Sequence, residues 1–236
     1  MTNMPALSLV AVPGRRQVTI ELATEIECRG FSGIKSPSLS DSLALCEALA
    51  FAAEHIQFGS TIAPIYFRQV ADYAQTVAFV HELSGGRFFF GVSVSHEPAL
   101  KQKAFTAGKP LSDSENFVSE LKAVPRVGEL PPITLAALRG KMIAPSERIG
   151  DRLVFANGAR PHMAKSLGGR SDSVRAAVEF FIGDMIPTYI DNDVEVAKAV
   201  NCKMLSGYAM LPNYRNYWKE VGYQQEMEGA EQAIAV

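Results

Sequence analysis

The sequence predicts one α/β domain over residues 1–236, a barrel of the TIM (β/α)₈ type that lacks its last βα unit. Short runs of β type alternate with segments of helical period, which is the pattern of repeated βα units around a parallel sheet. The run FFFGVSVS at 88–95 is apolar without strict alternation, as in a parallel strand covered on both faces. We count about seven strands, whereas closure of such a barrel needs eight.

The first half of the chain is expected to hold four strands with helices between them. The strands are expected at 8–12, 33–35, 56–65 and 88–95. The first helix carries apolar residues at helical spacing from Val18 to Ile26. The second helix begins at a cap on Ser40 or Asp41, and the third covers 69–83.

The second half is expected to continue the alternation less regularly. An irregular loop at 98–110 precedes a helix at 113–124, and Pro145 weakens a later helix at 141–149. The remaining strands are expected at 131–138, 152–157 and 179–190. The chain is completed by a loop around 168–173, a helix over 193–209 and a polar, largely helical tail to Val236.

Composition excludes several classes of function. The 23 basic and 25 acidic side chains nearly cancel and form no long run, so nucleic acid and acidic membranes are not expected as partners. The cysteines are odd in number and lack Cys-x-x-Cys spacing, so neither a disulfide framework nor a zinc site is expected. No run of apolar residues is long enough to span a membrane. We therefore expect a cytoplasmic protein with no metal site.

The carboxyl ends of the strands are the expected location of the chemistry, because active sites of such barrels lie there. These ends fall at 13–15, 35–38, 61–64, 93–96, 136–139, 157–160 and 187–189. They hold a histidine, several hydroxyls, arginines and small residues, with very few carboxylates. Such a ring suits an anionic cofactor.

Residues 56–96 carry a resemblance to a known family, and they read IQFGSTIAPIYFRQVADYAQTVAFVHELSGGRFFFGVSVSH. This segment resembles the core of the luciferase-like monooxygenases. That family shows a strand ending in Gly-Thr-like residues, an Arg before an Ala-rich helix, Leu-Ser-Gly-Gly-Arg-Phe and a Gly-Val-Gly-like strand. The similarity continues through ELPPITLAALRGKM, LVFANGARPHM and YAMLPNYRNYWKEVGY, so it covers roughly residues 7–235.

The resemblance implies a flavin- or deazaflavin-dependent oxidoreductase or monooxygenase that acts on a small organic substrate. Its cofactor would be FMN or the deazaflavin coenzyme F420, with the ring over a bulge in the third strand. In this family the bulge holds a non-proline cis peptide, which maps near Thr61-Ile62. The cofactor contacts carried over by position are Thr61, Ile62, Ser93, Ser95, His96, Ala136, Ala137, Leu138, Arg139, Asn157, Gly158 and Ala159.

Two departures from the family pattern bear on function. The segment KSPSLSD after the second strand lacks the histidine or acidic residue that the family usually places near the reactive edge of the ring. The chain also stops at Val236, before the usual eighth strand and helix, as a shortened chain, a natural short member or an incomplete sequence. An incomplete barrel exposes apolar strand edges, so a homodimer or a covering tail is expected.

Several roles stay open at the level of sequence. His96 is the best candidate for catalysis as a proton donor, and the alternative is a histidine that positions a phosphate or anchors a loop. Arg68 either contacts ligand or pairs with a carboxylate at a helix start, and Arg139 either binds an anion or is solvated. The aromatic residues Tyr208, Tyr214, Tyr217, Trp218 and Tyr223 form a substrate lid or pack against the barrel. The rival function is a noncatalytic flavin-binding or dimer-forming scaffold.

Overall fold

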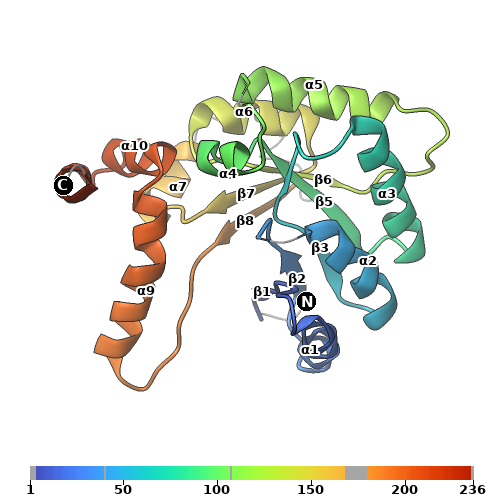
Figure 1. The fold of residues 1–236 in the computed structure, drawn as a ribbon, viewed down its shortest axis with the longest axis horizontal. Helices are drawn as coiled ribbons and strands as arrows, with labels where there is room; N and C mark the ends of the chain where they lie inside the picture. Colours follow the sequence, from blue (N-terminus) through green and yellow to red (C-terminus); the bar gives the residue numbers. More distant parts are fainter. Residues whose placement is uncertain (1–3, 40, 107, 168–179, 235–236) are drawn as a thin grey trace.

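The computed structural model describes residues 4–39, 41–106, 108–167 and 180–234. Its strands form a parallel sheet in the order β1-β2-β3-β5-β6-β7-β8, with β4 paired to β5. The strands are β1 (Ala6–Ser8), β2 (Gly33–Ser36), β3 (Gln57–Ser60), β4 (Ala63–Pro64), β5 (Phe88–Ser93), β6 (Ile133–Ala136), β7 (Arg152–Ala156) and β8 (Phe181–Met185). The sheet curves into a half-barrel, as Figure 1 shows. The predicted fold class is therefore confirmed.

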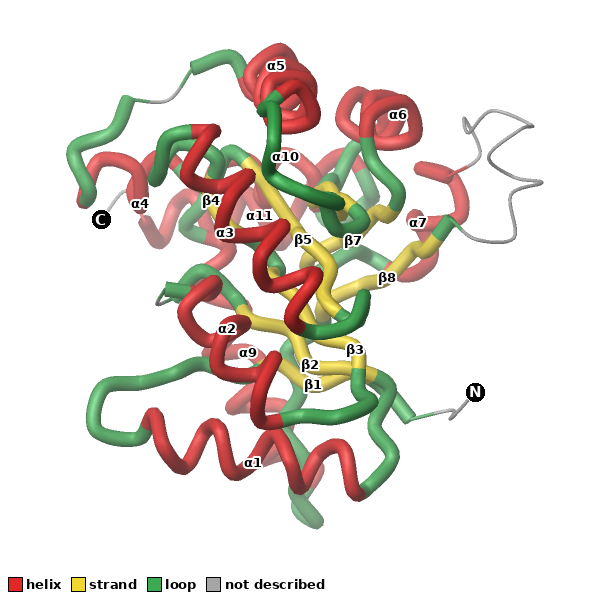
Figure 2. The backbone as a smooth tube through the Cα atoms, turned by 90° about the vertical axis from the view of Figure 1, so that its right-hand side faces the viewer, coloured by secondary structure: helices red, strands yellow, loops and turns green. Residues whose placement is uncertain are grey.

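Helices follow most strands and cover the outer face of the sheet; in Figure 2, α3 crosses in front of the strands and α1 runs below them. The helices are α1 (Arg16–Cys28), α2 (Ser42–Ala52), α3 (Val70–Leu83), α4 (Glu97–Gln102), α5 (Pro110–Ala123), α6 (Gly140–Ile149), α7 (Arg160–Leu167), α9 (Val194–Ala209), α10 (Pro212–Glu220) and α11 (Gln224–Ile234). Asp41 caps α2, because its Oδ1 accepts hydrogen bonds from the amides of Leu43 and Ala44, both at 3.2 Å.

The main hydrophobic core lies between the sheet and α1, α2, α3 and α5. Phe58, Phe88 and Phe90 point outward from the sheet into this core and are almost fully buried. The ring of Phe90 lies 5.5 Å from that of Tyr73 and 6.5 Å from that of Phe117, measured between centroids. A second, smaller cluster surrounds Leu153 and Phe155 on β7.

Several predicted boundaries were wrong. The first strand lies at Ala6–Ser8 rather than 8–12, because its register with β2 pairs Ala6 with Gly33. The stretch expected as an irregular loop contains α4, whose first turn accommodates Pro98 and whose Leu100 is buried. For the same reason, Pro110 starts α5 earlier than expected.

Other differences concern the later part of the chain. The helix α7 follows β7 and was not anticipated. The seventh predicted strand ends at Met185 rather than at 190, since β8 pairs only with β7 among the described residues and the chain then leaves the sheet. Pro145 lies within α6, which continues through it. The loop expected around 168–173 lies outside the described residues.

Candidate cofactor site at the strand ends

The third predicted strand is broken into β3 and β4, and the peptide bond Thr61–Ile62 at the break is cis. The amide of Thr61 donates a hydrogen bond to the carbonyl oxygen of Ser36 at 2.8 Å. Ser60 Oγ donates to the carbonyl oxygen of Gly91 at 2.8 Å and accepts from its amide at 3.0 Å. A Cβ at Gly91 would lie 2.1 Å from the carbonyl oxygen of Ser60, so only glycine fits there. The break is thus held in place from both neighbouring strands.

Two buried polar side chains at the strand ends have no hydrogen-bond partner within the described residues. They are Thr61, through Oγ1, and Asn157, through both Oδ1 and Nδ2. Each residue is only 7% exposed. Asn157 also adopts a left-handed backbone conformation, with φ of 54°. An unsatisfied buried polar group costs about 1–3 kcal/mol, so these groups mark a place where a ligand or water would supply the missing bonds.

The end of β5 supplies Ser93, Ser95 and His96 to the same edge. Ser95 has a left-handed φ of 66°, which turns the chain out of the sheet before α4. The His96 ring lies 5.5 Å from the ring of Tyr214 on α10, measured between centroids. Burial lowers the pKa of His96 below its ordinary value, so the imidazole is mainly neutral at pH 7. A neutral imidazole has one N–H donor and one acceptor nitrogen.

The end of β6 leads directly into the N-terminus of α6. Residues 136–139 contribute Ala136, Ala137 and Leu138 near the backbone, followed by Arg139 as the N-cap, whose side chain makes no capping bond. The amide of Ala137 donates to the carbonyl oxygen of Val154 at 3.0 Å. Arg139 Nη1 lies 3.7 Å from Glu220 Oε2, and both side chains are about half exposed. The ion pair between Arg139 and Glu220 is therefore weak, and a bound anion would compete with the Glu220 carboxylate for the guanidinium.

The end of β7 presents three amides that are already bonded within the chain. The amide of Asn157 donates to the carbonyl oxygen of Met185 at 2.9 Å. The amide of Gly158 donates to Asp184 Oδ1 at 3.1 Å, and the amide of Ala159 donates to Tyr217 Oη at 2.9 Å. A phosphate bound by the last two amides would have to displace a side chain of β8 or α10.

Helix α10 covers this part of the edge with aromatic side chains. Tyr214 and Tyr217 are 3% and 1% exposed, respectively. Trp218 Nε1 donates to the carbonyl oxygen of Asn157 at 3.4 Å. The Tyr214 ring lies 4.9 Å from that of Tyr208 and 5.6 Å from that of Trp218, between centroids. The structure thus shows these rings packed on the barrel, whereas Tyr223 is 41% exposed.

Asp184 is a site residue that sequence reasoning missed. It lies in β8, is half-buried and contacts the Gly158 amide. Burial raises its pKa above the ordinary value, although hydrogen bonds from the amides of Gly158 and Met185 oppose the shift. The signal was present as a lone carboxylate within the apolar run FFIGDMI. No motif surrounds this carboxylate, so the sequence predicts only a strand residue there.

The other candidate residues lie away from this edge. Arg68 Nη2 pairs with Asp41 Oδ2 at 2.8 Å at the start of α2, which is the structural alternative for that residue. His81 lies buried in α3, with Nδ1 3.3 Å from the carbonyl oxygen of Phe88. Among the described residues, no group of three or more His, Cys, Asp or Glu side chains is placed to hold a metal. No helix in the described part of the chain is long and apolar enough to cross a membrane.

Comparison with known proteins addresses the resemblance directly. Residues 11–118 match the family model described as luciferase-like monooxygenase. The resemblance to this family is confirmed over these residues, which make up slightly less than half of the chain. No curated protein matches the chain.

Solved structures share the luciferase-like fold over most of the chain. An F420-dependent secondary alcohol dehydrogenase superposes with a TM-score of 0.73 at 15% identity, covering 89% of this chain and 75% of that chain. The F420-dependent tetrahydromethanopterin reductase of Methanopyrus kandleri gives 0.72 at 11% identity, over 96% and 81% of the two chains. The FMN-bound oxygenating constituent of 3,6-diketocamphane monooxygenase from Pseudomonas putida gives 0.66 at 15% identity, over 93% and 78%. Identities this low establish the fold alone.

Proposed function

We propose that this protein is a flavin- or deazaflavin-dependent oxidoreductase or monooxygenase that acts on a small organic substrate. The observation that carries the proposal is the pair of buried, unpartnered polar side chains, Thr61 and Asn157, at the strand ends of a luciferase-like fold. The solved structures with this fold include enzymes named for F420 and one bound to FMN, so either cofactor is proposed here.

Different residues at the strand ends are proposed to contact the ring and the anionic part of such a cofactor. Thr61 and Ile62 would lie against the ring, and the Thr61 hydroxyl and Asn157 amide would bond its polar edge. The anionic part would contact the β5 and β6 ends. The residues proposed for that contact are Ser93, Ser95, His96, Ala136, Ala137, Leu138 and Arg139. Their support is the uncapped N-terminus of α6, which favours negative charge.

Gly158 and Ala159 remain in the proposed cofactor set, but we expect them to contribute less to cofactor binding than the other residues. Their amides are bonded to Asp184 and Tyr217, so they would join the site only if those side chains moved. We therefore propose that the residues at the ends of β5 and β6 bind the anionic part of the cofactor without Gly158 and Ala159. When bound, a cofactor of this kind supplies the hydride or activates the oxygen.

Two side chains are proposed to handle the proton that the chemistry requires. His96 is neutral near pH 7 because burial lowers its pKa, so it is able to accept a proton or to donate a hydrogen bond. Asp184 has a raised pKa, also through burial, which keeps a larger share of the carboxyl protonated than in a free aspartate. His96 remains the proposed catalytic residue, since it lies in the cofactor set.

The rival function is a noncatalytic flavin-binding or dimer-forming scaffold, and one observation favours it. Helix α10 covers the end of β7. There the Ala159 amide donates a hydrogen bond to Tyr217 Oη, and Trp218 Nε1 donates one to the carbonyl oxygen of Asn157. A cover of this kind leaves less room for substrate above the ring. The enzyme predicts turnover with a reductant and a substrate, whereas the scaffold predicts a bound chromophore without turnover.

A variant pair tests the proposed cofactor site. Thr61→Val removes the unpartnered hydroxyl while keeping the side-chain shape. Loss of one hydrogen bond of about 1 kcal/mol should weaken FMN or deazaflavin binding roughly fivefold. Thr188→Val is the control, because Thr188 is exposed and bonds only its own turn through the carbonyl oxygen of Ile186. Equal affinity in T61V and wild type, measured by fluorescence titration, would remove Thr61 from the site.

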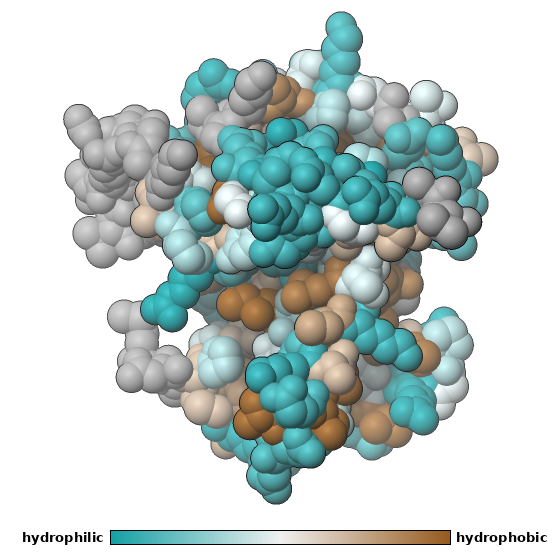
Figure 3. Space-filling model, turned by 90° about the vertical axis from the view of Figure 1, so that its left-hand side faces the viewer, coloured by the Kyte–Doolittle hydropathy of each residue, from teal (hydrophilic) through white to brown (hydrophobic). Residues whose placement is uncertain are grey.

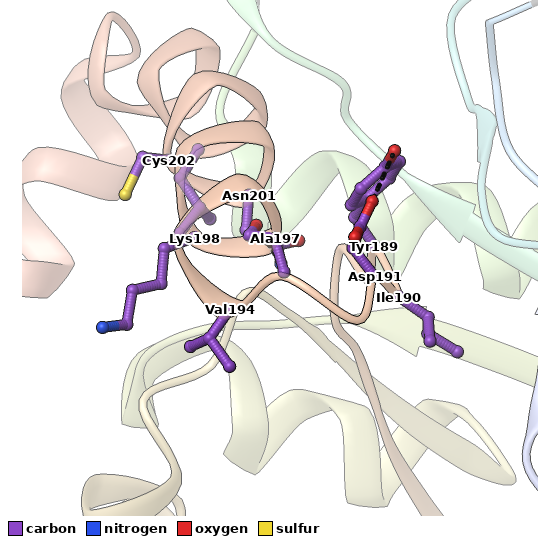
Figure 4. Close-up of a pocket in the computed structure, with 9 residues that line it drawn as sticks. Tyr189, Ile190, Asp191, Val194, Ala197, Lys198, Asn201 and Cys202 are labelled. Carbon is purple, nitrogen blue, oxygen red and sulfur yellow. Dashed lines mark hydrogen bonds between the residues drawn. The ribbon is translucent and has the colours of Figure 1, made fainter.

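We also infer a homodimer, supported by the exposed apolar surface around α9. None of the residues of α9 is buried, and Val194 and Ile190 are 61% and 90% exposed. An open groove of about 450 Å³ lies between α9 and the arm that precedes it. Figure 4 shows Tyr189, Ile190 and Asp191 of this arm opposite Val194, Ala197 and Asn201 of the helix. On the face that includes α9, apolar side chains gather below a polar upper part (Figure 3).

The dimer is tested by light scattering coupled to size-exclusion chromatography. Ile190→Asp places a charge on the groove and should convert the dimer to a monomer. Leu39→Asp is a matched control, since Leu39 is 82% exposed and lies near the start of α2. A wild-type monomer, or a dimer that both variants leave intact, would contradict this interface.

A further inference from the structure

Two cations lie on the concave face of the sheet, one near the end of β2 and one at the start of β7. Lys35 of β2 is aligned with Gly59, which is aligned with Phe89 of β5. Arg152 of β7 is aligned with Phe181 of β8. Aligned residues of parallel neighbours project to the same face, and this is the face opposite to the one that packs Phe58, Phe88 and Phe90 on the helices.

Both cations contact the same two aromatic rings. Lys35 Nζ lies 3.7 Å from the centroid of the Phe89 ring and 5.4 Å from that of Phe181. The Arg152 guanidinium carbon lies 5.1 Å and 5.8 Å from the same two centroids. Two like charges therefore share one aromatic environment, drawn from four strands.

Neither cation has a carboxylate within salt-bridge distance among the described residues. Burial and the nearby Arg152 charge lower the pKa of Lys35 to about 7. Burial also lowers the pKa of Arg152, although the charge of the neighbouring Asp151 opposes that shift. Aromatic faces offset only part of the cost of removing a cation from water, and they do nothing to relieve repulsion between two cations. An anion bound between the two cations would offset both the desolvation cost and the repulsion.

A third group faces the same space and lacks a partner. Thr134 of β6 is aligned with Arg152, so the two side chains are neighbours on the concave face. Its Oγ1 is buried without a hydrogen bond among the described residues, and Thr134 is only 2% exposed. The hydroxyl adds a neutral donor beside the guanidinium, which is the combination that oxyanions bind.

We propose that Lys35, Arg152 and Thr134 form an oxyanion-binding site on the concave floor of the half-barrel, which takes the carboxylate or phosphate group of a small molecule. The proposal does not depend on the proposed function. Arg152 and Phe181 begin their strands, and Arg152 lies roughly 13 Å from Ala156 along β7 at the usual rise per residue. Lys35 is next to Ser36, whose carbonyl oxygen accepts a hydrogen bond from the Thr61 amide, so the site extends from the start of β7 toward the candidate cofactor site. Phe181 is 42% exposed, so solvent reaches the ring that lies against both cations.

The first experiment uses the wild-type protein and the reactivity of Lys35. Its low pKa leaves much of the amine neutral near pH 7, so an amine-selective reagent should label it faster than exposed lysines. Inorganic phosphate and acetate are added in turn at constant ionic strength, with chloride as the balancing salt, and labelling is followed by peptide mass spectrometry. The site predicts that one or both oxyanions slow Lys35 labelling at least fivefold and saturably, while labelling of the exposed Lys101 stays unchanged.

The two arms distinguish the sources of the anionic group. Protection by phosphate alone identifies phosphorylated ligands, and protection by acetate alone identifies carboxylates. Lack of saturable protection by either overturns the proposal. Protection that rises with protein concentration in the absence of added anion also overturns it, because a carboxylate of a second copy of the chain would then fill the site.

A second experiment asks whether the named side chains bind the anion. Arg152→Met and Thr134→Val should each weaken the anion-dependent rise in Tm at least fivefold. Lys101→Met is the control, since Lys101 is an exposed residue of α4 that pairs with Glu97 at 2.7 Å. An equal rise in wild type and all variants would reveal a general salt effect and contradict the site. If Arg152→Met does not fold, the labelling experiment on wild type still decides.

Discussion

The two halves of the sheet differ in how they are held together. From β1 to β6 the strands share one large core with α1, α2, α3 and α5, and aromatic residues of β5 lie within it. At β7 and β8 the core is a small cluster around Leu153 and Phe155, and α9 buries none of its residues. The part of the sheet up to β6 is therefore packed more extensively, whereas the later part carries the exposed apolar surface for which we propose a dimer contact.

Deleting the Phe90 ring should give the largest loss of stability. Phe90→Ala leaves a cavity between Tyr73 and Phe117 and should lower the free energy of unfolding by about 3–5 kcal/mol. Phe79→Ala should change it by less than about 0.5 kcal/mol, because Phe79 is 58% exposed on α3. Urea denaturation checks both values. Similar losses in the two variants would remove the contrast between core and surface.

Adding one methyl group at Gly91 should have the next largest effect. The new Cβ would meet the Ser60 carbonyl oxygen, so Gly91→Ala should destabilise the fold by about 1–3 kcal/mol and weaken cofactor binding. Gly207→Ala on α9 is the matched control, since nothing lies within 4 Å of the added atom there. It should stabilise the protein by about 0.5–1 kcal/mol, because alanine favours a helix interior. Thermal and urea unfolding would refute the account if G91A were as well tolerated as G207A.

Removing the Tyr217 hydroxyl tests the cover over the β7 end. Tyr217→Phe loses the bond to the Ala159 amide and should cost about 1 kcal/mol of stability. Cofactor affinity should not fall, because the β5 and β6 ends are proposed to hold the anion. Tyr189→Phe, at an exposed ring, is the control. A cofactor affinity that fell only in Y217F would move the hydroxyl into the binding site.

The smallest effect is expected in the pH dependence contributed by Asp184. Its folded pKa is raised above the unfolded value, so the folded state favours the protonated carboxyl. Stability from this group is therefore present below the unfolded pKa, near 4, and is lost as pH rises through the folded pKa. As pH rises through that window, the Tm of the wild-type protein should fall relative to the Tm of Asp184→Asn. A constant difference from pH 3.5 to 8 would contradict the raised pKa.

The sequence predicted the order of strands and helices because apolar periodicity depends on local neighbours. It placed the strand break at Thr61–Ile62 only through the family resemblance, since the residues themselves read as one continuous strand. It did not predict α4 or the role of Asp184, because the burial of Leu100 and the hydrogen bond from the Gly158 amide to Asp184 depend on residues distant in the sequence. The resemblance also placed Gly158 and Ala159 among the cofactor contacts, whereas in the structure their amides bond Asp184 and Tyr217, which lie farther along the chain.

The interior cations show the same limit. Lys35 and Arg152 are far apart in the sequence, and no motif joins them. Their common contacts with Phe89 and Phe181 follow from strand register across the curved sheet. Periodicity predicts which residues face one side of a strand, but the register between distant strands determines which of them meet.

The central claim is that the strand ends bind a flavin or a deazaflavin, and one titration tests it most directly. An absorbance spectrum of the purified protein is followed by fluorescence titration with FMN and with the deazaflavin coenzyme under identical conditions, with T61V and T188V alongside. We expect saturable binding of at least one of the two, roughly fivefold weaker in T61V and unchanged in T188V. Binding of neither compound by the wild-type protein would contradict the account.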